Sequence, residues 1–447
     1  MHDGYQLSSK LFNKLYGDSE PLREIRVLDL THFIFGPMIS EFLALFGAEV
    51  IKVEAPDEGD RWRLGPYWWR YWKDSNLLFH HCNANKLFIA VDLKKPKGRD
   101  LILKLASISD VVVENFRAGL AEAWGIGYSQ VSKINPKVIY VSCSGYGQWG
   151  PLKYLPSFDL IAQSVSGVAL KTGFPGGKKY KLQDYYGDYL PALVGAVAVM
   201  AALIYREKTG RGQYIDIAQA ECMMRIMHDW TYLSITGEDL GCSGNVDPTM
   251  APSGIFKTSD GKFIALAIAT DEQFLALMKA MGRNDLAQDK RFQETLERLR
   301  PENAAYINKI VEEWIKTKKA TEVIELANEY GFPASEVVDD WQIINEEWRK
   351  ERRSIGEVED HMYGRVVIPI FPATFEKTPA KIKWLARPVG YHNRYVLKKL
   401  LGLSEKDIKR LEKEGVIGYW DNVVGLRPPC YYDIERDPIF NYKEGEE

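Results

Sequence analysis

The chain has 447 residues, with 58 Lys and Arg against 61 Asp and Glu, which gives a formal net charge of −3. This near balance, without a basic stripe, excludes the class of proteins that binds nucleic acids or anionic membranes through surplus positive charge. A hydrophobic content of 46% beside 27% charged residues excludes disorder for most of the chain, and the length suggests two or three domains.

The N-terminal segment, MHDGYQLSSKLFNKLYGDSE, carries charges where a secretory signal would need an apolar core, so we expect no export and a cytoplasmic location. Strand, helix, strand units follow it. The hydrophobic spacing predicts strands at 26–30, 49–54, 87–93, 110–114 and 138–142, and helices at 38–46 and 97–107. This alternation is typical of an α/β domain with a mostly parallel sheet.

The longest largely apolar run, Leu190 to Tyr205, has 16 residues and is flanked by Asp188 and Arg206. Because a helix needs about 20 apolar residues to cross a bilayer, we interpret this run as a buried helix. The turn at 209–213 then leads into a further strand, YIDIA.

The composition becomes irregular and richer in Gly and Thr at 230–252, which indicates a linker. A hairpin with the turn Ser259-Asp260-Gly261 then opens a second, smaller unit, and helices are predicted at 271–281, 302–317, 320–330, 395–401 and 404–414, the last capped by Ser404. The expected divisions are a large domain at 22–229, a linker at 230–252, a small domain at 253–335, a return to the large domain at 336–417 and a C-terminal extension at 418–447.

Cysteine and histidine patterns do not indicate a metal centre. The five cysteines are scattered and never spaced as C-x-x-C: Cys82, Cys143, Cys222, Cys242 and Cys430. His80 and His81 are adjacent, so their side chains point in different directions. We therefore expect neither a disulfide scaffold nor a metal site.

A G-x-G-x-x-G pattern stands at Gly145, Gly147 and Gly150, directly after a predicted strand. Pro151 follows it, and no apolar helical pattern begins for several residues. A dinucleotide fingerprint must open a helix, so we interpret these glycines as a tight loop that lets the backbone approach some ligand.

Three further groups of residues leave alternatives open. The aromatic cluster of Tyr67, Trp68, Trp69, Tyr71 and Trp72 fits either an aromatic acyl pocket or packing. Lys178, Lys179 and Lys181 fit either a solvated turn or contacts to phosphate. Asp159, Asp184 and Asp188 are candidates for chemistry at strand ends, and equally for helix caps or salt-bridge partners.

Read together, ordered segments resemble the family III CoA-transferases, also called the CaiB/BaiF family. The resemblance runs from about Val27 to Ile417. It is carried by VLDLTHFIFGPMISEFLALFGAEVIKVEAPDEGD, NANKLFIAVDLK, DVVVENFRAG, VSCSGYGQWGP, SFDLIAQSVSGVALKTG, GDYLPALVGAVAVMAALIYREKTGRGQYIDI, GIFKTSDGKFIAL and RPVGYHNRYVLKKLLGLSEKDIKRLEKEGVI.

The resemblance implies a Rossmann-like large domain built from both chain ends, an inserted small α+β domain, and two subunits interlocked like links of a chain. It also implies transfer of CoA from a thioester to a free carboxylic acid, with CoA and acyl-CoA as substrates and no permanently bound cofactor. In the family an aspartate attacks the acyl-CoA, so the reaction passes through enzyme anhydride and aspartyl-CoA intermediates.

The same resemblance implies a set of CoA-contacting residues: Phe33, Ile34, Phe35, Val91, Lys94, Asn115, Phe116, Arg117, Ser144, Gly145, Tyr146 and Gly147. Gly145 and Gly147 would let the backbone approach pantetheine. Phe116 can cover adenine, and Lys94 or Arg117 can pair with phosphate. Ala55 and Ala123 stand where many members have arginine.

The family nucleophile has no counterpart at its expected place. The family pattern puts an aspartate three residues after the glycine of a Thr-Gly pair, and an ungapped match from Thr172-Gly173 puts Gly176 there. The related racemase branch uses a histidine before its first aspartate, and this chain has Phe158 before Asp159.

We therefore expect this chain to be the subunit without a nucleophile in a heteromeric transferase, paired with a homologous subunit that carries the aspartate. The donor would be succinyl-CoA, and the acceptor an aromatic succinate such as benzylsuccinate. Two alternatives stay open: a self-sufficient homodimeric transferase that uses Asp184 or Asp159, and a non-catalytic CoA-binding or scaffold protein.

Overall fold

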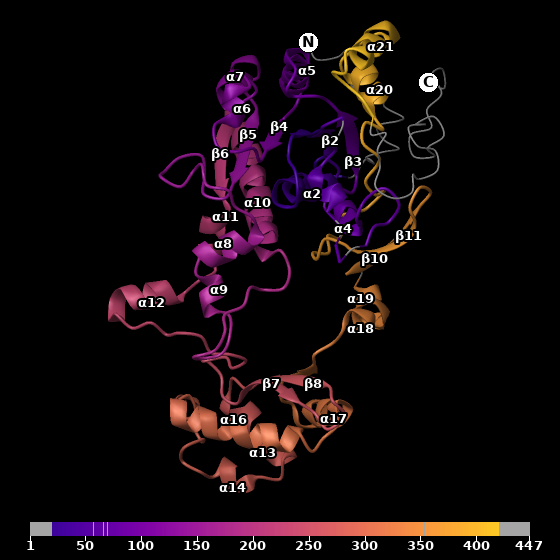
Figure 1. Ribbon diagram of the computed structural model, residues 1–447. Helices are drawn as coiled ribbons and strands as arrows, with labels where there is room; N and C mark the ends of the chain where they lie inside the picture. The colour runs from indigo at the N-terminus through magenta and orange to yellow at the C-terminus, as the bar shows by residue number, and fades with distance from the viewer. Residues whose placement is uncertain (1–19, 57, 66, 69, 353, 420–447) are drawn as a thin grey trace. The chain divides into compact units, whose positions relative to one another are not determined.

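The computed structural model of the chain describes residues 20–56, 58–65, 67–68, 70–352 and 354–419. They form two compact units: residues 20–167, 182–227 and 347–419 make up the larger, and residues 168–181 and 228–346 the smaller. Both units can be followed in Figure 1 by label and colour. Residues 168–181, 230–252 and 336–346 thus group with the smaller unit, and not with the large domain or a linker as we expected.

Short runs of apolar and β-branched residues form the main sheet of the larger unit. Its six strands lie in the order β3-β2-β1-β4-β5-β6 and every neighbouring pair is parallel. Their bounds are Arg26–Asp29 (β1), Glu49–Glu54 (β2), Lys86–Ala90 (β3), Val111–Glu114 (β4), Ile139–Ser144 (β5) and Gln213–Ala218 (β6). The predicted α/β class with a parallel sheet and these strands is confirmed.

Alternate residues of each strand point to two hydrophobic cores, because side chains in a strand have a period of two. Leu28 and Ile51 pack with helices α5, η1 and α21, whereas Val27 and Val50 pack with α2 and α10. Helix α21 lies beside α5, although the two are far apart in sequence (Figure 1). The helices of this unit are Phe35–Leu45 (α2), Arg61–Leu64 (α3), Leu77–His81 (α4), Pro96–Ser107 (α5), Leu120–Ala123 (α6), Tyr128–Ile134 (α7), Asp159–Val165 (α8), Tyr186–Thr209 (α10), Gln219–Met224 (α11), Glu347–Glu351 (α19), Asn393–Tyr395 (α20), the π-helix Val396–Leu400 (η1) and Glu405–Lys413 (α21).

Helix α10 is longer and less buried than we expected from the sequence. It spans 24 residues, enough in length and apolar composition to cross a membrane, a test that core helices of soluble proteins also pass. One face packs closely on α2, where a Cβ at Gly195 would lie 2.4 Å from Ile39. The other face exposes Leu193, Val194, Val197, Met200 and Ile204. The expected buried helix is therefore buried on one face only, because α2, α8, α11 and the sheet cover just that side.

The smaller unit packs helices on an antiparallel sheet. Its strands are Ser253–Lys257 (β7), Phe263–Ala267 (β8) and Ala334–Glu336 (β9), and the predicted hairpin with Gly261 in the turn is confirmed. Its helices are Val168–Lys171 (α9), Asp229–Thr236 (α12), Asp271–Ala280 (α13), Asn284–Ala287 (α14), Thr295–Arg298 (α15), Pro301–Ile315 (α16), Ala320–Tyr330 (α17) and Asp340–Asn345 (α18). Helix α12 lies where we expected an irregular linker. None of its residues is buried, so its sequence has no apolar stripe that could reveal it.

The C-terminal part of the chain returns to the larger unit and protects the edge of its sheet. Ser404 caps α21 as predicted, and a hairpin that the sequence did not reveal lies at Ile355–Asp360 (β10) and Gly364–Pro369 (β11). The backbone N–H of Phe88 donates to His392 Nδ1 at 2.8 Å, and that of Ala90 donates to Asn393 Oδ1 at 2.8 Å. Side chains thus accept the hydrogen bonds of N–H groups on the outer edge of β3, as the carbonyls of a further strand would.

Glu41 of α2 is buried, with 3% of its surface exposed. Burial raises the pKa of its carboxyl to about 8, although the nearby Lys86 acts in the opposite direction. At pH 7 the carboxyl is therefore neutral in the folded chain but ionised in the unfolded chain, where its pKa has the ordinary value of 4.5. A raised pKa favours the folded state below pH 4.5, and this advantage is lost as the pH rises toward 8.

The variant Glu41→Gln cannot ionise, so we expect it to resemble the wild type near pH 4 and to become more stable than the wild type as the pH rises. At pH 7 the gain in the free energy of unfolding should approach about 3 kcal/mol, from roughly 1.4 kcal/mol per pH unit. Urea unfolding from pH 4 to 8 measures it, with the exposed Glu24→Gln as the control. A difference that does not change with pH would contradict a neutral Glu41.

Candidate functional site

The strand order reverses between β1 and β4, so the connections that follow these two strands run in opposite directions along the sheet. We call the carboxyl ends of β1 and β4 the switch point. Ligands of open α/β sheets bind at such a switch point. The loops that follow the two strands are tied together by one side chain. The N–H of His32 donates to Asn115 Oδ1 at 2.8 Å, and Asn115 Nδ2 donates to the carbonyl of His32 at 2.8 Å. The expected segments Phe33–Phe35 and Asn115–Arg117 are therefore neighbours.

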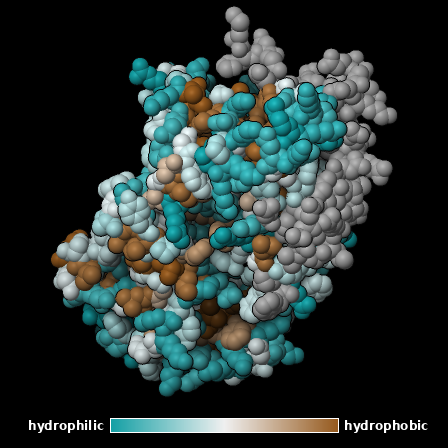
Figure 2. All heavy atoms as spheres, turned by 45° about the horizontal axis from the view of Figure 1, so that its top comes forward, coloured by the Kyte–Doolittle hydropathy of each residue, from teal (hydrophilic) through white to brown (hydrophobic). Residues whose placement is uncertain are grey.

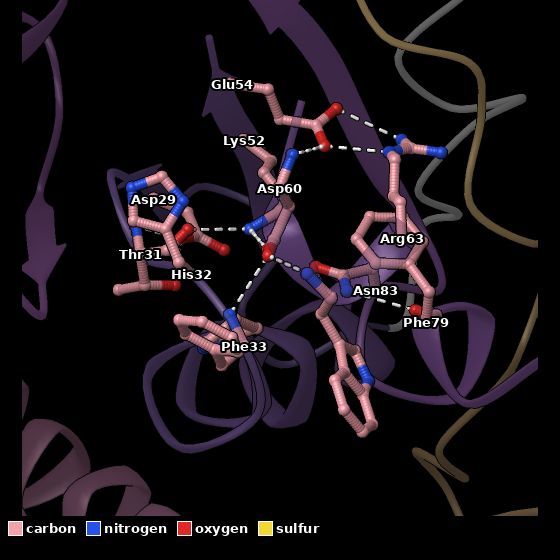
Figure 3. Close-up of polar contacts among 12 residues, drawn as sticks. Asp29, Thr31, His32, Phe33, Lys52, Glu54, Asp60, Arg63, Phe79 and Asn83 are labelled. Carbon is pink, nitrogen blue, oxygen red and sulfur yellow. Dashed lines mark hydrogen bonds and ion pairs between the residues drawn. The ribbon is translucent and has the colours of Figure 1, made fainter. Parts of the chain in front are cut away.

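Asp60 holds the loop after β1 in place (Figure 3). Its Oδ1 accepts hydrogen bonds from the backbone N–H of Phe33 at 3.0 Å and of Trp62 at 2.9 Å, and its Oδ2 lies 3.0 Å from Lys52 Nζ. Burial alone would raise the pKa of Asp60, but Lys52 and these hydrogen bonds keep it below its usual value. Phe33 has a φ of 65°, which is rare for a bulky residue and is fixed here by the carboxylate.

The charges around Asp60 continue as a buried network below the switch point. Asp29 accepts from Thr31 N at 2.9 Å and pairs with Lys86 at 2.9 Å. Lys52 also donates to the carbonyl of Thr31 at 2.8 Å, and because Asp60 pairs with Lys52 and Asp29 with Lys86, each lysine has a carboxylate partner within the fold. On the far side of Lys52, Glu54 binds Arg63 through two hydrogen bonds of 2.8 and 3.0 Å (Figure 3). The network fixes the backbone around the loop after β1.

A second pair of carboxylates supports the loops after β4 and β5. Glu114 Oε2 accepts from Phe116 N at 2.7 Å, and burial raises the pKa of Glu114 to about 7. Asp216 Oδ2 accepts from Gln148 N at 2.8 Å. Neither these carboxylates nor Asp60 stood out in the sequence, because each becomes a support only when segments distant in sequence meet.

The glycine loop after β5 has two different physical requirements. A Cβ at Gly145 would lie 2.1 Å from Ser157 Cβ, so Gly145 is required by packing within the chain. Gly147 has a φ of 84°, which only glycine adopts readily. The loop does not open a helix, because α8 begins only at Asp159. The prediction of a tight loop rather than a dinucleotide fingerprint agrees with this geometry.

Several buried polar atoms in the segments around this edge have no hydrogen-bond partner among the described residues; besides two carboxylate oxygens, of Asp60 and Asp216, they include His32 Nδ1, Trp62 Nε1, Ser144 Oγ and Gln148 Nε2. Buried polar atoms are almost always satisfied, so such atoms need an explanation. Burial lowers the pKa of His32, which keeps its ring neutral. The indole, the hydroxyl and the amide are donors that a bound oxygen-rich ligand would satisfy.

The other expected contact residues are placed unevenly. Arg117 is exposed beside the switch point, whereas Phe116 is only 9% exposed and forms an edge-to-face pair with Trp124. Lys94 is exposed after β3, and Val91 is buried and pairs with Ile417. Since β2 separates β3 from β1, the structure does not bring Val91 and Lys94 next to the switch point.

The aromatic side chains divide between packing and the site. Trp72 Nε1 donates to the carbonyl of Tyr363 at 2.9 Å, and the hydroxyl of Tyr71 to that of Leu64 at 2.6 Å, as expected for packing. Two edge-to-face pairs instead lie around the switch point. Phe33 and Phe158 have ring centroids 5.2 Å apart, and those of Trp62 and Tyr185 are 5.5 Å apart. Trp69 lies outside the described residues.

The three candidate aspartates have different surroundings. Asp159 Oδ1 accepts from Gly187 N at 2.8 Å and from Gln163 Nε2 at 2.9 Å, so it fastens the start of α10. Asp188 accepts from Gln219 Nε2 at 2.5 Å, and burial together with Asp159 raises its pKa to about 7. Asp184 is exposed.

Gly176 belongs to the smaller unit, in a short hairpin closed by the pairing of Gly173 with Lys179. Its φ is 66°, and no atom lies within 4 Å of where a Cβ would be. His80 contacts Ser75 and His81 contacts Tyr189, in separate surroundings. Among the residues that the structure describes, no group of three or more His, Cys, Asp or Glu side chains could hold a metal ion.

Comparison with known proteins relates the chain to one family. The sequence profile of CoA-transferase family III matches residues 22–393. Succinyl-CoA:D-citramalate CoA-transferase of Chloroflexus aurantiacus is 34% identical over 399 residues, which are 89% of this chain and 98% of that protein. The alpha and beta subunits of succinyl-CoA:L-malate CoA-transferase of the same organism are each 33% identical over 89% of this chain, and over 92% and 98% of their own lengths. The crystal structure of a CaiB/BaiF family protein from Brucella suis matches with a TM-score of 0.76 at 29% identity, and covers 86% of this chain and 100% of that one.

The variant Asp60→Ala tests the buried network, because it leaves Lys52 without its nearest carboxylate and frees the N–H groups of Phe33 and Trp62. We expect a loss of about 3–5 kcal/mol in the free energy of unfolding, the usual cost of breaking a buried ion pair. Chemical unfolding measures it. The control is Glu58→Ala, whose carboxylate forms an exposed pair with Arg61 and should change stability by less than about 1 kcal/mol. Equal losses in the two variants would contradict the role of Asp60.

Proposed function

The chain belongs to CoA-transferase family III, and from that membership we propose that it is a subunit of an enzyme that moves CoA from succinyl-CoA to a free carboxylic acid. Succinyl-CoA is named as the donor in the relatives that act on citramalate and malate. CoA enters as a substrate and leaves on the product, so the reaction calls for no resident cofactor.

We place the acyl-CoA at the carboxyl edge of the sheet, over the loops after β1, β4 and β5. The support for this is the set of unpartnered donors there, from Trp62, Ser144 and Gln148, and the exposed Arg117, whose guanidinium suits a phosphate. The N-terminus of α2 begins at the same loop without a side-chain cap, which also favours a negatively charged ligand.

The observation that supports a nucleophile in a second subunit is Gly176, which stands where the family has its catalytic aspartate. Transfer in this family needs a carboxylate that attacks the thioester, and glycine has no side chain to acylate. We therefore assign the nucleophile to a homologous partner subunit. In its reaction the carboxylate oxygen attacks the thioester carbon and CoA leaves as a thiolate. That thiolate then attacks the resulting anhydride, which yields an aspartyl-CoA thioester and the donor's free acid.

Two further observations support a homologous partner. The malate enzyme among the relatives is named by an alpha and a beta subunit, both similar to this chain. The outer face of α10 also exposes a row of apolar side chains, and apolar residues reach the surface on the face of the molecule in Figure 2. Exposed apolar patches of this kind mark protein interfaces.

The alternatives are weaker for stated reasons. Asp159 is occupied by Gly187 and Gln163, so its use as a nucleophile would free the start of α10. Asp184 is exposed and unhindered, and it remains the fallback for a self-sufficient homodimer. A non-catalytic CoA-binding protein would bind acyl-CoA without transferring it in any combination of subunits.

For the acceptor we propose an aromatic succinate such as benzylsuccinate. The support is the aromatic surroundings of the switch point, where Phe33 meets Phe158 and Trp62 meets Tyr185. An aromatic ring of the acceptor could pack against these side chains. Each such ring pair stabilises binding by about 0.5–1.5 kcal/mol beyond the contribution of the buried surface.

The test of this function is CoA transfer by the chain alone and by the chain co-expressed with its homologous partner. We expect transfer from succinyl-CoA to benzylsuccinate only in the second sample, with the acyl or CoA adduct found by mass spectrometry on the partner. Malate, citramalate and glutarate complete the acceptor panel. Transfer by the isolated chain, abolished by Asp184→Ala, would instead establish the homodimer.

The variant Gly176→Asp tests the position of the missing nucleophile. Aspartate tolerates the left-handed backbone at a cost of about 1–2 kcal/mol, and the open space around Gly176 accepts the side chain. We expect the isolated variant to gain a CoA transfer that the isolated wild type lacks. Gly177→Asp is the matched control one residue away, and equal activity in both variants would contradict the assignment.

A further inference from the structure

Two segments of the smaller unit are fastened side by side through Gly173. In the hairpin 172–180, Gly173 pairs with Lys179, and Tyr180 N donates to the carbonyl of Thr172 at 3.1 Å. On its other side, the carbonyl of Gly173 accepts from Gly244 N at 3.1 Å. The hairpin and the segment 239–244 therefore share one point of attachment.

Two side chains strengthen this attachment. Lys171, just before the hairpin, pairs with Asp239 at 2.5 Å and with Asp229 at 3.2 Å. The ring of Phe174 occupies the space beside Gly244, where a Cβ would lie 2.8 Å from it. The positions of Lys179 and Cys242 are thus set by contacts on both sides of them.

Between the hairpin 172–180 and the segment 239–244, Lys179 Nζ lies 2.9 Å from Cys242 Sγ. The thiol also donates to the carbonyl of Phe174 at 3.4 Å. Lys179 is exposed and Cys242 is partly exposed, so a small oxidant can reach both. The other three described cysteines, Cys82, Cys143 and Cys222, are buried. Burial raises the pKa of each of these thiols, which makes them poor nucleophiles.

We propose that Lys179 and Cys242 form a covalent modification site, in which a peroxide oxidises the pair to a reversible N–O–S link between lysine nitrogen and cysteine sulfur. A primary amine next to an oxidisable thiol is the chemical requirement for such a link. The separation of the two atoms is one that a single bridging oxygen can span after a small side-chain movement.

The reaction balances with hydrogen peroxide as the oxidant. One peroxide oxidises the thiol to a sulfenic acid and leaves as water. A second peroxide removes one hydrogen from the amine and one from the sulfenic acid as the N–O bond forms, and leaves as two molecules of water. The S–H bond and one N–H bond are broken, sulfur and nitrogen are oxidised, and the peroxide oxygens are reduced. Thiol reductants reverse the link by attack at sulfur.

The link would fasten the hairpin that carries Gly176 to the segment 239–244 by a covalent bond in place of hydrogen bonds. It stands independently of the proposed transfer reaction, because it depends only on contacts within the smaller unit. Its effect on the protein is a loss of freedom in this hairpin under oxidising conditions.

The experiment treats the purified full-length chain with hydrogen peroxide, digests it and identifies linked peptides by mass spectrometry. We expect one linked pair, containing Lys179 and Cys242, with the summed mass of the two peptides plus one oxygen and minus two hydrogens. The pair should disappear after treatment with dithiothreitol. Limited proteolysis within the hairpin should be slowed several-fold in the oxidised protein.

Matched variants separate this link from unspecific oxidation. Lys179→Arg keeps the positive charge but has no primary amine, so the link should be absent and Cys242 should proceed to sulfinic acid. Lys178→Arg changes the neighbouring lysine and should leave the link intact, and circular dichroism checks that both variants are folded. Cys242 oxidised to sulfinic acid in the wild type without a link, a link to Lys178, or a link without the added oxygen would each overturn the proposal.

Discussion

The buried charges of the first three strands are the constraint on which the larger unit depends. Asp29, Lys52, Asp60 and Lys86 have fully buried side chains, and burying an unpaired charge would cost several kcal/mol. Each of them must therefore find its partner before the sheet can close. Since the partners include the backbone groups of Thr31 and Phe33, satisfying the charges also sets the path of the loop after β1. Buried ion pairs add little net stability, and here their main effect is on conformation.

Hydrophobic periodicity was sufficient to predict the main sheet and the described α-helices of nine or more residues, because those elements bury regular apolar faces; most of the shorter helices were not predicted. It missed α12 and the β10–β11 hairpin, whose exposed residues follow no such pattern. It also placed α10 wholly inside the fold, since composition alone does not tell how many neighbours cover a helix. Apolar content reports that a segment avoids water, not what it is packed against.

The candidate site was predictable in part. The segments after β1, β4 and β5 followed from the family resemblance, and their meeting at the switch point follows from the strand order. Their supports did not. Lys52 and Glu54 alternate with Ile51 and Val53 in β2, a pattern typical of a strand with one exposed face, yet both are buried and ionic. Only the folded arrangement, in which Asp60 and Arg63 come back over that strand, explains the charges. Gly176 is the opposite case. The sequence alone reveals that the nucleophile is missing there, and the surrounding structure gives no further sign of it, because no atom lies within 4 Å of where a Cβ would be.

The side chains of His392 and Asn393 complete the outer edge of β3, and they are translated about 300 residues after that strand. During synthesis on the ribosome the N-terminal half of the sheet can assemble, but the edge of β3 keeps its N–H groups unpaired until the C-terminal segment has emerged. An open edge is a template for pairing with other chains. The larger unit therefore finishes folding only after residues 392 and 393 have emerged, and until then the edge of β3 is open to pairing with other chains.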